Sequence, residues 1–411
     1  MKFAVFIMGA LQTGLLTLVP ILMDRTGISA VNWSWLMALG LFVYVLSSPS
    51  WGRVIDRIGA KKALFYSFLW LLLSQVLLMV SVQWLAVQLS FAALCVALVA
   101  ARVGYGLTAS GVFPAAQTWI TQQHSENAAM ASALARLNVV SQLGRLLGPI
   151  LVSVWVLFDA PLLSIWSLLF LGLAFAFYLW FSDSSAGQLI DKSTDEFAAE
   201  LAVDEAMPNT GHDVKHTQGD FSWQQALPVY LMAFSLTGFL GALQFLLGPY
   251  LQTLWSITAE QASAQLGAML TTAALVSVVV ALKIGPRLFA QGVTTLAVVL
   301  VLISLGSLLL VVSDQVVALH IAVACLSSAV ALATPWYGMV LRQTWSQSQG
   351  RIAGQLASVH MAGYGVGTLL GGWALQALGI NVMQLFVLFP LVMLLCMAWV
   401  LFRFVRRISL H

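Results

Sequence analysis

A polar stripe interrupts the apolar segment 129–156. It consists of Asn138, Ser141, Gln142 and Arg145. The spacing i, i+3, i+4, i+7 places these side chains on one face of a helix. A guanidinium flanked by amide and hydroxyl groups can hold a carboxylate or another anion through charge-assisted hydrogen bonds. We therefore predict that the stripe binds a small molecule, and the alternative is a polar network buried between neighbouring helices.

Other polar side chains within apolar segments are candidates for the same site or for proton binding. The further binding candidates are Arg102, Tyr105, Gln244 and Tyr364. The candidates for proton binding or coupling are Asp24, His360 and Arg102. Histidine is included because its charge changes near neutral pH. Two alternatives stay open: Asp24 can simply pair with Arg25, and His360 can be an ordinary hydrogen-bonded helix contact.

The balance of deep charges favours an anionic or zwitterionic ligand. Arg102, Arg136 and Arg145 lie within apolar segments, and no carboxylate lies equally deep. An arginine in a membrane span costs about 2.5–3.5 kcal/mol on insertion scales, so each should face protein or water. A pocket lined by the 15 Trp and 22 Phe residues, with broad specificity for amphiphiles, is the alternative.

The composition predicts that lipid surrounds the helices that position these side chains. The chain has 411 residues, of which 60% are hydrophobic and 8% charged. Soluble domains are about 45–50% apolar and about 25% charged. The net charge of +3 is too small to indicate a nucleic-acid partner. All three cysteines lie in apolar runs, and no metal-ligand spacing, phosphate loop or nucleophile motif is present. We therefore expect no metal, no cofactor and no enzymatic activity.

Twelve apolar runs are long enough to cross a bilayer, which takes roughly 20 residues. The first six lie near 3–23, 33–51, 63–83, 93–120, 129–156 and 160–181, and the second six near 228–252, 260–283, 293–313, 316–342, 352–377 and 380–402. The first run is interpreted as a spanning helix rather than a signal peptide, because no small-residue cleavage site follows it.

The segment between the two sets of six is polar and acidic. Such a segment cannot bury enough apolar surface to order a core. We therefore predict an N-terminal six-helix bundle over 1–181, a flexible cytoplasmic linker over 182–225 and a C-terminal six-helix bundle over 226–411. Lysine and arginine concentrate on the side that holds the linker, which places both termini in the cytoplasm. We expect the bacterial inner membrane as the location.

The two halves repeat each other in sequence. The segment GRLLGPILVS (144–153) aligns with GTLLGGWALQ (367–376). Small residues at four-residue spacing let helices approach closely. The expected packing residues are Gly144, Gly148, Pro149, Gly367 and Gly371. The predicted fold is all-α, with 12 transmembrane helices in two pseudo-symmetric six-helix bundles and a binding site between inverted or repeated halves near the midplane.

The segment WGRVIDRIGAKK (51–62) matches Gly-x-x-x-Asp-Arg-x-Gly-x-Lys-Lys after the second run. It resembles the loop signature of the major facilitator superfamily, and the resemblance covers essentially the whole chain. In that family the loop latches the cytoplasmic side of the two halves. The resemblance assigns this role to Gly52, Asp56, Arg57, Gly59 and Lys61.

Two further motifs resemble a branch of that family. GRLLGP is similar to the glycine-proline motif of drug/proton antiporters, although Val152 and Ser153 stand where two glycines usually follow. ARVGYG is similar to the fourth-helix arginine motif linked to proton coupling, which implies a coupling role for Arg102. The resemblance implies a monomeric, proton-coupled exporter that works by alternating access.

The expected cargo is a small anionic or zwitterionic organic compound, such as a carboxylate siderophore or metabolite. The expected partners are this small molecule, protons and the lipid bilayer. The alternatives are a multidrug or amphiphile efflux pump, an importer, a membrane-embedded enzyme and a membrane sensor that has lost transport. Loss of the charges in 51–62 separates the sensor from a transporter, because only a transporter should depend on them.

Overall fold

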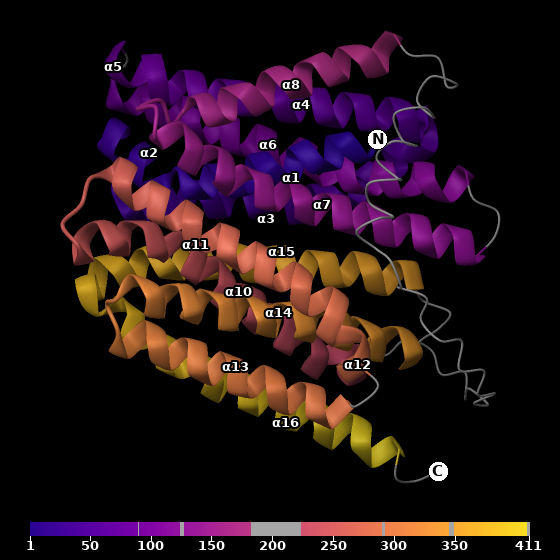
Figure 1. Cartoon of the computed structure of the whole chain (residues 1–411). Helices are drawn as coiled ribbons and strands as arrows, with labels where there is room; N and C mark the ends of the chain where they lie inside the picture. The colour runs from indigo at the N-terminus through magenta and orange to yellow at the C-terminus, as the bar shows by residue number, and fades with distance from the viewer. Residues whose placement is uncertain (89, 124–126, 182–222, 290–291, 345–348, 409–411) are drawn as a thin grey trace. The chain divides into compact units, whose positions relative to one another are not determined.

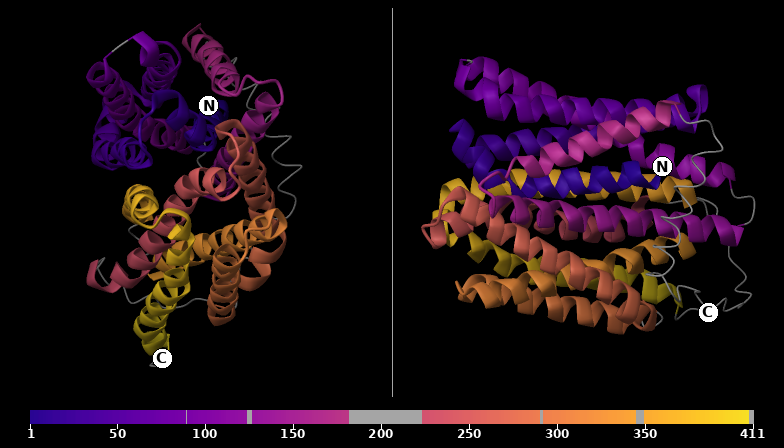
Figure 2. Two further views of the ribbon diagram at one scale, coloured as in Figure 1. Left: turned by 90° about the vertical axis from the view of Figure 1, so that its left-hand side faces the viewer. Right: turned by 45° about the horizontal axis from the view of Figure 1, so that its top comes forward.

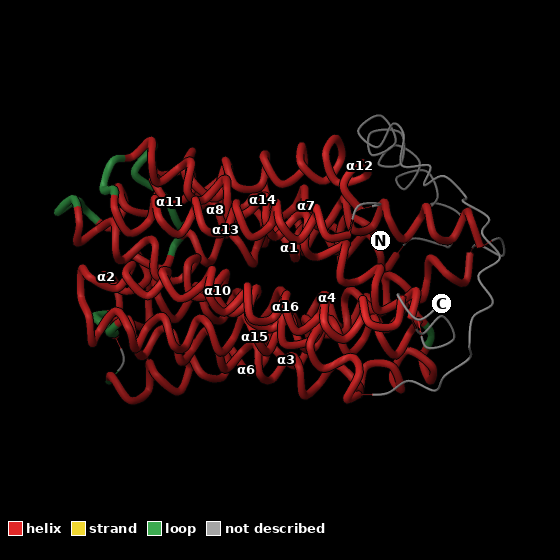
Figure 3. Tube along the Cα trace, turned by 90° about the horizontal axis from the view of Figure 1, so that it is seen from below, coloured by secondary structure: helices red, strands yellow, loops and turns green. Residues whose placement is uncertain are grey.

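The described part of the protein is helical throughout. The computed structural model describes residues 1–88, 90–123, 127–181, 223–289, 292–344 and 349–408. Within these ranges helices are joined by short loops, and no strand occurs (Figure 3). This confirms the predicted all-α class.

The first half of the chain forms long helices and several shorter helical pieces (Figure 1). They are α1 (Lys2–Thr17), α2 (Val19–Thr26), α3 (Ala30–Ile58), α4 (Ala60–Val80), η1 (Ser81–Leu85), α5 (Ala86–Gln88), α6 (Phe91–Gln123), α7 (Asn127–Val156) and α8 (Leu163–Phe181). The run predicted as one helix over 3–23 is bent by 57° between α1 and α2. Pro20 stands at the start of α2 and explains the bend, since proline has no N–H and its ring clashes with the preceding turn.

The second half has the same character. Its elements are α10 (Trp223–Leu254), α11 (Ala259–Val279), η2 (Val280–Ile284), α12 (Gly285–Phe289), α13 (Gly292–Val312), α14 (Val316–Thr344), α15 (Gln349–Leu378), η4 (Gly379–Val387) and α16 (Leu388–Ile408). Gly379 follows α15 with a φ of +54°, a conformation that glycine adopts readily. This left-handed residue separates the last two helices.

The number of spans agrees with the twelve predicted. Ten described helices are long and apolar enough to cross a membrane, and the bent α1–α2 pair makes eleven. The longest apolar stretch, Gly354–Phe402, contains both α15 and α16. Counting these two helices separately brings eleven to twelve.

The chain divides into two compact units. The first unit comprises Met1–Val203, Ala242–Thr271 and Thr368–Ile380, and the second comprises Asp204–Gly241, Thr272–Gly367 and Asn381–His411. Residues 182–222 lie outside the described residues. The predicted linker over 182–225 and the division at that linker therefore remain predictions.

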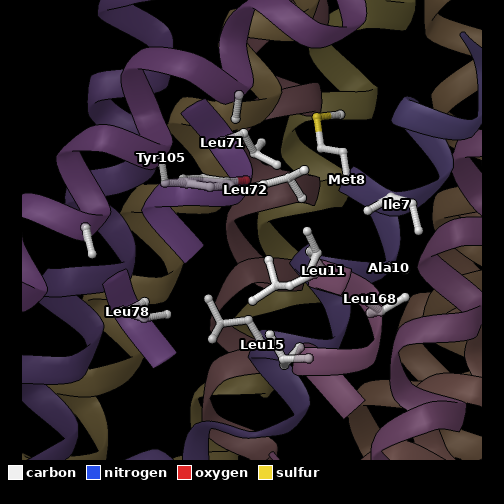
Figure 4. Close-up of a cluster of buried hydrophobic side chains, with 14 of the residues drawn as sticks. Ile7, Met8, Ala10, Leu11, Leu15, Leu71, Leu72, Leu78, Tyr105 and Leu168 are labelled. Carbon is white, nitrogen blue, oxygen red and sulfur yellow. The ribbon is translucent and has the colours of Figure 1, made fainter. Parts of the chain in front are cut away.

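Helix α1 lies in the core of the first unit and is apolar on nearly all sides, as a fully buried helix should be. It packs most extensively against α7, and α4 packs against α6. Figure 2 shows these helices, coloured from indigo to magenta, from two further directions. Figure 4 shows the buried cluster around α1, which includes Ile7, Met8, Ala10, Leu11, Leu15, Leu71, Leu72 and Leu168.

Candidate functional site

Helix α7 carries its polar stripe along the edge of its contact with α1. Asn138 and Gln142 are exposed, Arg145 is half-buried and Ser141 is buried. Exposed amides in an apolar span need water or protein as partners, because hydrocarbon offers no hydrogen bonds. Three of the four predicted side chains are therefore accessible in the first unit, while Ser141 turns toward α1.

Glycines on α7 bring α1 into direct backbone contact beside this stripe. A Cβ atom added at Gly144 would overlap the Phe6 carbonyl, and one at Gly148 would overlap the Ala10 carbonyl. In the opposite direction, a Cβ atom at Gly9 would lie 2.7 Å from the Ser141 carbonyl oxygen. This close packing fixes the rotation of α7 about its axis, and the rotation decides which side chains remain exposed.

A hydrogen bond between the two helices lies at the level of Arg145. The Thr13 hydroxyl lies 2.8 Å from the Arg145 carbonyl oxygen and 3.1 Å from the Gly9 carbonyl oxygen of its own helix. The single hydroxyl proton can serve either acceptor. Thr13 therefore ties α1 to the main chain of Arg145 and holds the start of its side chain in place.

The Arg145 charge interacts electrostatically with two tyrosines of the first unit. Tyr44 of α3 and Tyr105 of α6 lie close enough to interact with the Arg145 charge. A side-chain hydrogen bond joins Tyr105 and Gln12 of α1. Arg145 on α7 is thus coupled to phenols on α3 and α6, and Tyr105 is in turn bonded to α1. A guanidinium can hold a small anion through charge-assisted hydrogen bonds.

Arg102 occupies a different environment from Arg145. Its side chain is only 4% exposed. Its guanidinium donates to the Leu36 carbonyl at 3.3 Å and to the Met37 carbonyl at 3.5 Å, and it lies 4.5 Å from the centre of the Tyr105 ring. The structure encloses Arg102 between α3 and α6 within the first unit. Arg102 therefore packs its guanidinium on the Tyr105 ring. Its charge does not lie at the stripe on α7.

The candidates in the second half lie on α10 and α15. Gln244 and Tyr364 are half-buried, and the Tyr364 main chain contacts α10 at Gly241. The His360 Nε2 atom lies 2.6 Å from the Tyr337 hydroxyl on α14. Farther along α15, Gly367 contacts the Gly238 backbone and Gly371 lies near Ala242. The second unit thus joins His360 to a tyrosine that the sequence analysis did not single out.

The charged segment 51–62 lies at the junction of α3 and α4. Gly52, Asp56, Arg57 and Gly59 are exposed, and Lys61 is half-buried. Gly59 has a φ of +84°, so its role is to permit the turn. A Cβ atom added at Gly52 would meet no described atom within 4 Å. The latch role of this segment therefore stays a prediction.

The remaining candidates do not join these clusters. Asp24 and Arg25 are both exposed at the end of α2. Pro149 lies on α7 beside the α1 contact and near Gly267 of α11, within the first unit. Among the described residues, no group of three His, Cys, Asp or Glu side chains could hold a metal ion.

Sequence reasoning missed Tyr44, Gln12 and Tyr337. Gln12 is a polar residue within an apolar run, and this signal was available. Tyrosine is common at membrane interfaces, so Tyr44 and Tyr337 did not stand out among the aromatic residues. Only the structure shows that each of them faces a cationic or titratable side chain.

Comparisons with known proteins give a consistent picture of family and fold. The sequence model of the Major Facilitator Superfamily matches residues 2–359. The crystal structure of the nucleoside transporter NupG matches with a TM-score of 0.68 and 12% identity, covering 98% of each chain. A bacterial homologue of the human lysosomal transporter Spinster matches with a TM-score of 0.62 and 14% identity, covering 98% of this chain and 95% of the other.

A third similar structure is that of the human organic anion transporter MFSD10, with a TM-score of 0.61 and 17% identity over 96% of each chain. At these identities the likeness establishes the fold alone. No curated protein matches this chain in sequence.

Proposed function

The chain belongs to the Major Facilitator Superfamily, a family of multi-pass membrane transporters, and from this premise we propose that it exports a small anionic or zwitterionic organic compound in exchange for protons. The two halves alternate in exposing the binding site to the two sides of the bacterial inner membrane, and the protein works as a monomer. Both termini and the acidic segment 182–225 lie on the cytoplasmic side.

The accessible charge of Arg145 is the observation that carries this proposal. Arg145 lies within a span, among the exposed amides Asn138 and Gln142 and near two phenols. The described acidic residues stand at helix ends or in loops, and they are Asp24, Asp56, Asp159, Glu260 and Asp314. A cation entering this site would meet a like charge with no carboxylate nearby, whereas an anion would replace its lost water with charge-assisted hydrogen bonds.

The test is a ligand-binding screen on the purified protein at pH 6 and pH 8. The probes are citrate and benzoate as anions, uridine as a neutral nucleoside, and tetraphenylphosphonium as a cation. Uridine is included because NupG is a nucleoside transporter of the same fold. We expect an anion to raise the unfolding temperature of the wild-type protein. In Arg145→Ala the apparent affinity for the anion, obtained from the dependence of this shift on anion concentration, should fall at least tenfold.

Arg25→Ala is the matched control, because Arg25 is exposed at the end of α2 and remote from the stripe in the sequence. It should bind the anion like the wild type. Stabilisation by tetraphenylphosphonium, unchanged in Arg145→Ala, would contradict the anion proposal and favour a broad-specificity amphiphile pump. Anion uptake into right-side-out vesicles, with none into inverted vesicles, would contradict export and indicate an importer.

A further inference from the structure

A hydrogen-bonded group of three side chains lies within the second unit, between α14 and α15. The Tyr337 hydroxyl lies 2.6 Å from Nε2 of His360 and 3.2 Å from Oγ1 of Thr334. The two rings pack edge to face, with centroids 5.6 Å apart and an interplanar angle of 65°. Tyr337 is completely buried, and His360 is half-buried. The tyrosine is thus held in place while the imidazole keeps some access to its surroundings.

The hydrogen bond between Tyr337 and His360 can form whether or not Nε2 of His360 carries a proton. A tyrosine hydroxyl has one proton to donate and lone pairs that accept. When Nε2 carries no proton, the Tyr337 hydroxyl donates to it. When Nε2 carries a proton, it donates to the Tyr337 oxygen, and the tyrosine proton turns to Thr334 Oγ1. The hydrogen bond between His360 and Tyr337 therefore survives gain and loss of the proton.

Helices α14 and α15 each place a tyrosine near His360. Tyr337 is the titratable side chain on α14 that contacts it, and Tyr364 lies one turn away on α15. Where α10 crosses this part of α15, its residues at Gly363 are Phe234 and Thr237, neither of which titrates.

The other ionisable side chains of these helices lie farther along. Tyr230 of α10 is engaged by its hydrogen bond to Gln355, at 2.9 Å. The described parts of α10, α14 and α15 contain no carboxylate. The side chains of Arg342 and Arg351, near the ends of α14 and α15, lie outside the description.

We propose that His360 binds the transported proton and that Tyr337, with Thr334, is its positioning group. This inference rests on the proposed proton-coupled export, which it deepens by naming the site. An imidazolium inside a span needs water or protein dipoles around it. His360 therefore takes up a proton from water in one conformation and returns it to water on the other side in the next. No covalent bond changes, and the imidazole passes from neutral to cation and back.

The first experiment follows the histidine side chains by NMR in purified protein labelled with 15N-histidine. Comparison with His360→Gln assigns the His360 signal. We expect this signal to change with pH between pH 5 and pH 8, because gain of a proton alters both ring nitrogens. Tyr337→Phe should displace the Nε2 resonance and its titration midpoint while the fold persists. A His360 signal that stays constant from pH 5 to pH 8, or one that Tyr337→Phe leaves unchanged, would overturn the proposal.

His320 supplies the matched control on α14. Its Nδ1 lies 2.9 Å from the Val316 carbonyl oxygen, in the first turns of the helix and far from Tyr337 in sequence. His320→Gln should leave the His360 titration unchanged. This NMR test needs no substrate, so it reports on the proton site even when the proposed cargo is wrong.

A second experiment measures coupling with citrate as the probe. Proteoliposomes that contain a pH-sensitive dye report proton movement when citrate is added. In His360→Gln the citrate-driven pH change should fall at least tenfold, while His320→Gln retains it. A full citrate-driven pH change in His360→Gln would exclude His360 as the coupling group. Titration of His360 without any citrate-driven pH change in the wild type would support the proton site and contradict citrate as the cargo.

Discussion

The Thr13 hydroxyl lies 2.8 Å from the main-chain carbonyl oxygen of Arg145 and so joins the central helix α1 to α7, which carries this half-buried cation. The contact is possible because glycines at Gly144 and Gly148 bring the two backbones together on either side of it. The position of the Arg145 side chain thus depends on a helix contact as well as on its own rotamers.

Replacement of Thr13 by valine should weaken anion binding without unfolding the protein. Valine has nearly the same shape but no hydroxyl, so the Arg145 carbonyl loses its partner at a cost of about 0.5–1.5 kcal/mol. We expect a several-fold loss of citrate affinity, measured by isothermal titration calorimetry. Thr13→Ser should restore binding, since serine keeps the donor. Equal affinity in Thr13→Val and the wild type would show that this bond does not position Arg145.

Two glycines of similar sequence context should respond in opposite ways to alanine. A Cβ atom at Gly144 would overlap the Phe6 carbonyl, so Gly144→Ala must push α1 and α7 apart, at a cost of about 1–3 kcal/mol. A Cβ atom at Gly52 meets open space among the described residues, and alanine is favoured over glycine within a helix. Thermal unfolding in detergent should therefore show a lower transition temperature for Gly144→Ala and an equal or higher one for Gly52→Ala.

Much of the fold follows from the distribution of apolar residues. Runs of about 20 apolar residues require spanning helices whatever the detailed packing. The bend at Pro20 could have been predicted from the sequence, because proline disturbs the helical turn before it. The π-helical turn at Ser81–Leu85 had no such signal, since it depends on how α4 ends against its neighbours.

The site was predictable only as a set of candidates. Helical spacing placed Asn138, Gln142 and Arg145 on one face, and the structure leaves them accessible. The same reasoning could not distinguish Arg145 from Arg102, because both are arginines within apolar runs. Their environments differ through tertiary contacts: the carbonyls of Leu36 and Met37 enclose Arg102, and no sequence period encodes that contact.

The enclosed position of Arg102 leads to a prediction that separates stability from binding. Burial of a charge costs free energy through lost hydration, and a methionine of similar length avoids this cost. Arg102→Met should therefore leave the unfolding temperature unchanged or raise it. The same substitution removes the cation packed on the Tyr105 ring, at 4.5 Å, so citrate affinity should fall several-fold. Arg145→Met should lower citrate affinity more than Arg102→Met does. Equal losses of affinity in the two variants would indicate that both guanidinium groups contact the ligand.

The exposed Asp56 allows a test of transport itself. Asp56 lies at the end of α3 with its side chain open to solvent, so Asp56→Asn removes a charge without disturbing packing. We expect an unchanged unfolding temperature and at least a tenfold loss of citrate flux in vesicles, because the proposed latch uses this carboxylate to stabilise another conformation of the transport cycle. Arg25→Gln is the control, since it removes an exposed charge outside this segment. Wild-type flux in Asp56→Asn would show that the latch is dispensable. Absence of citrate flux from the wild type as well would contradict citrate as the cargo.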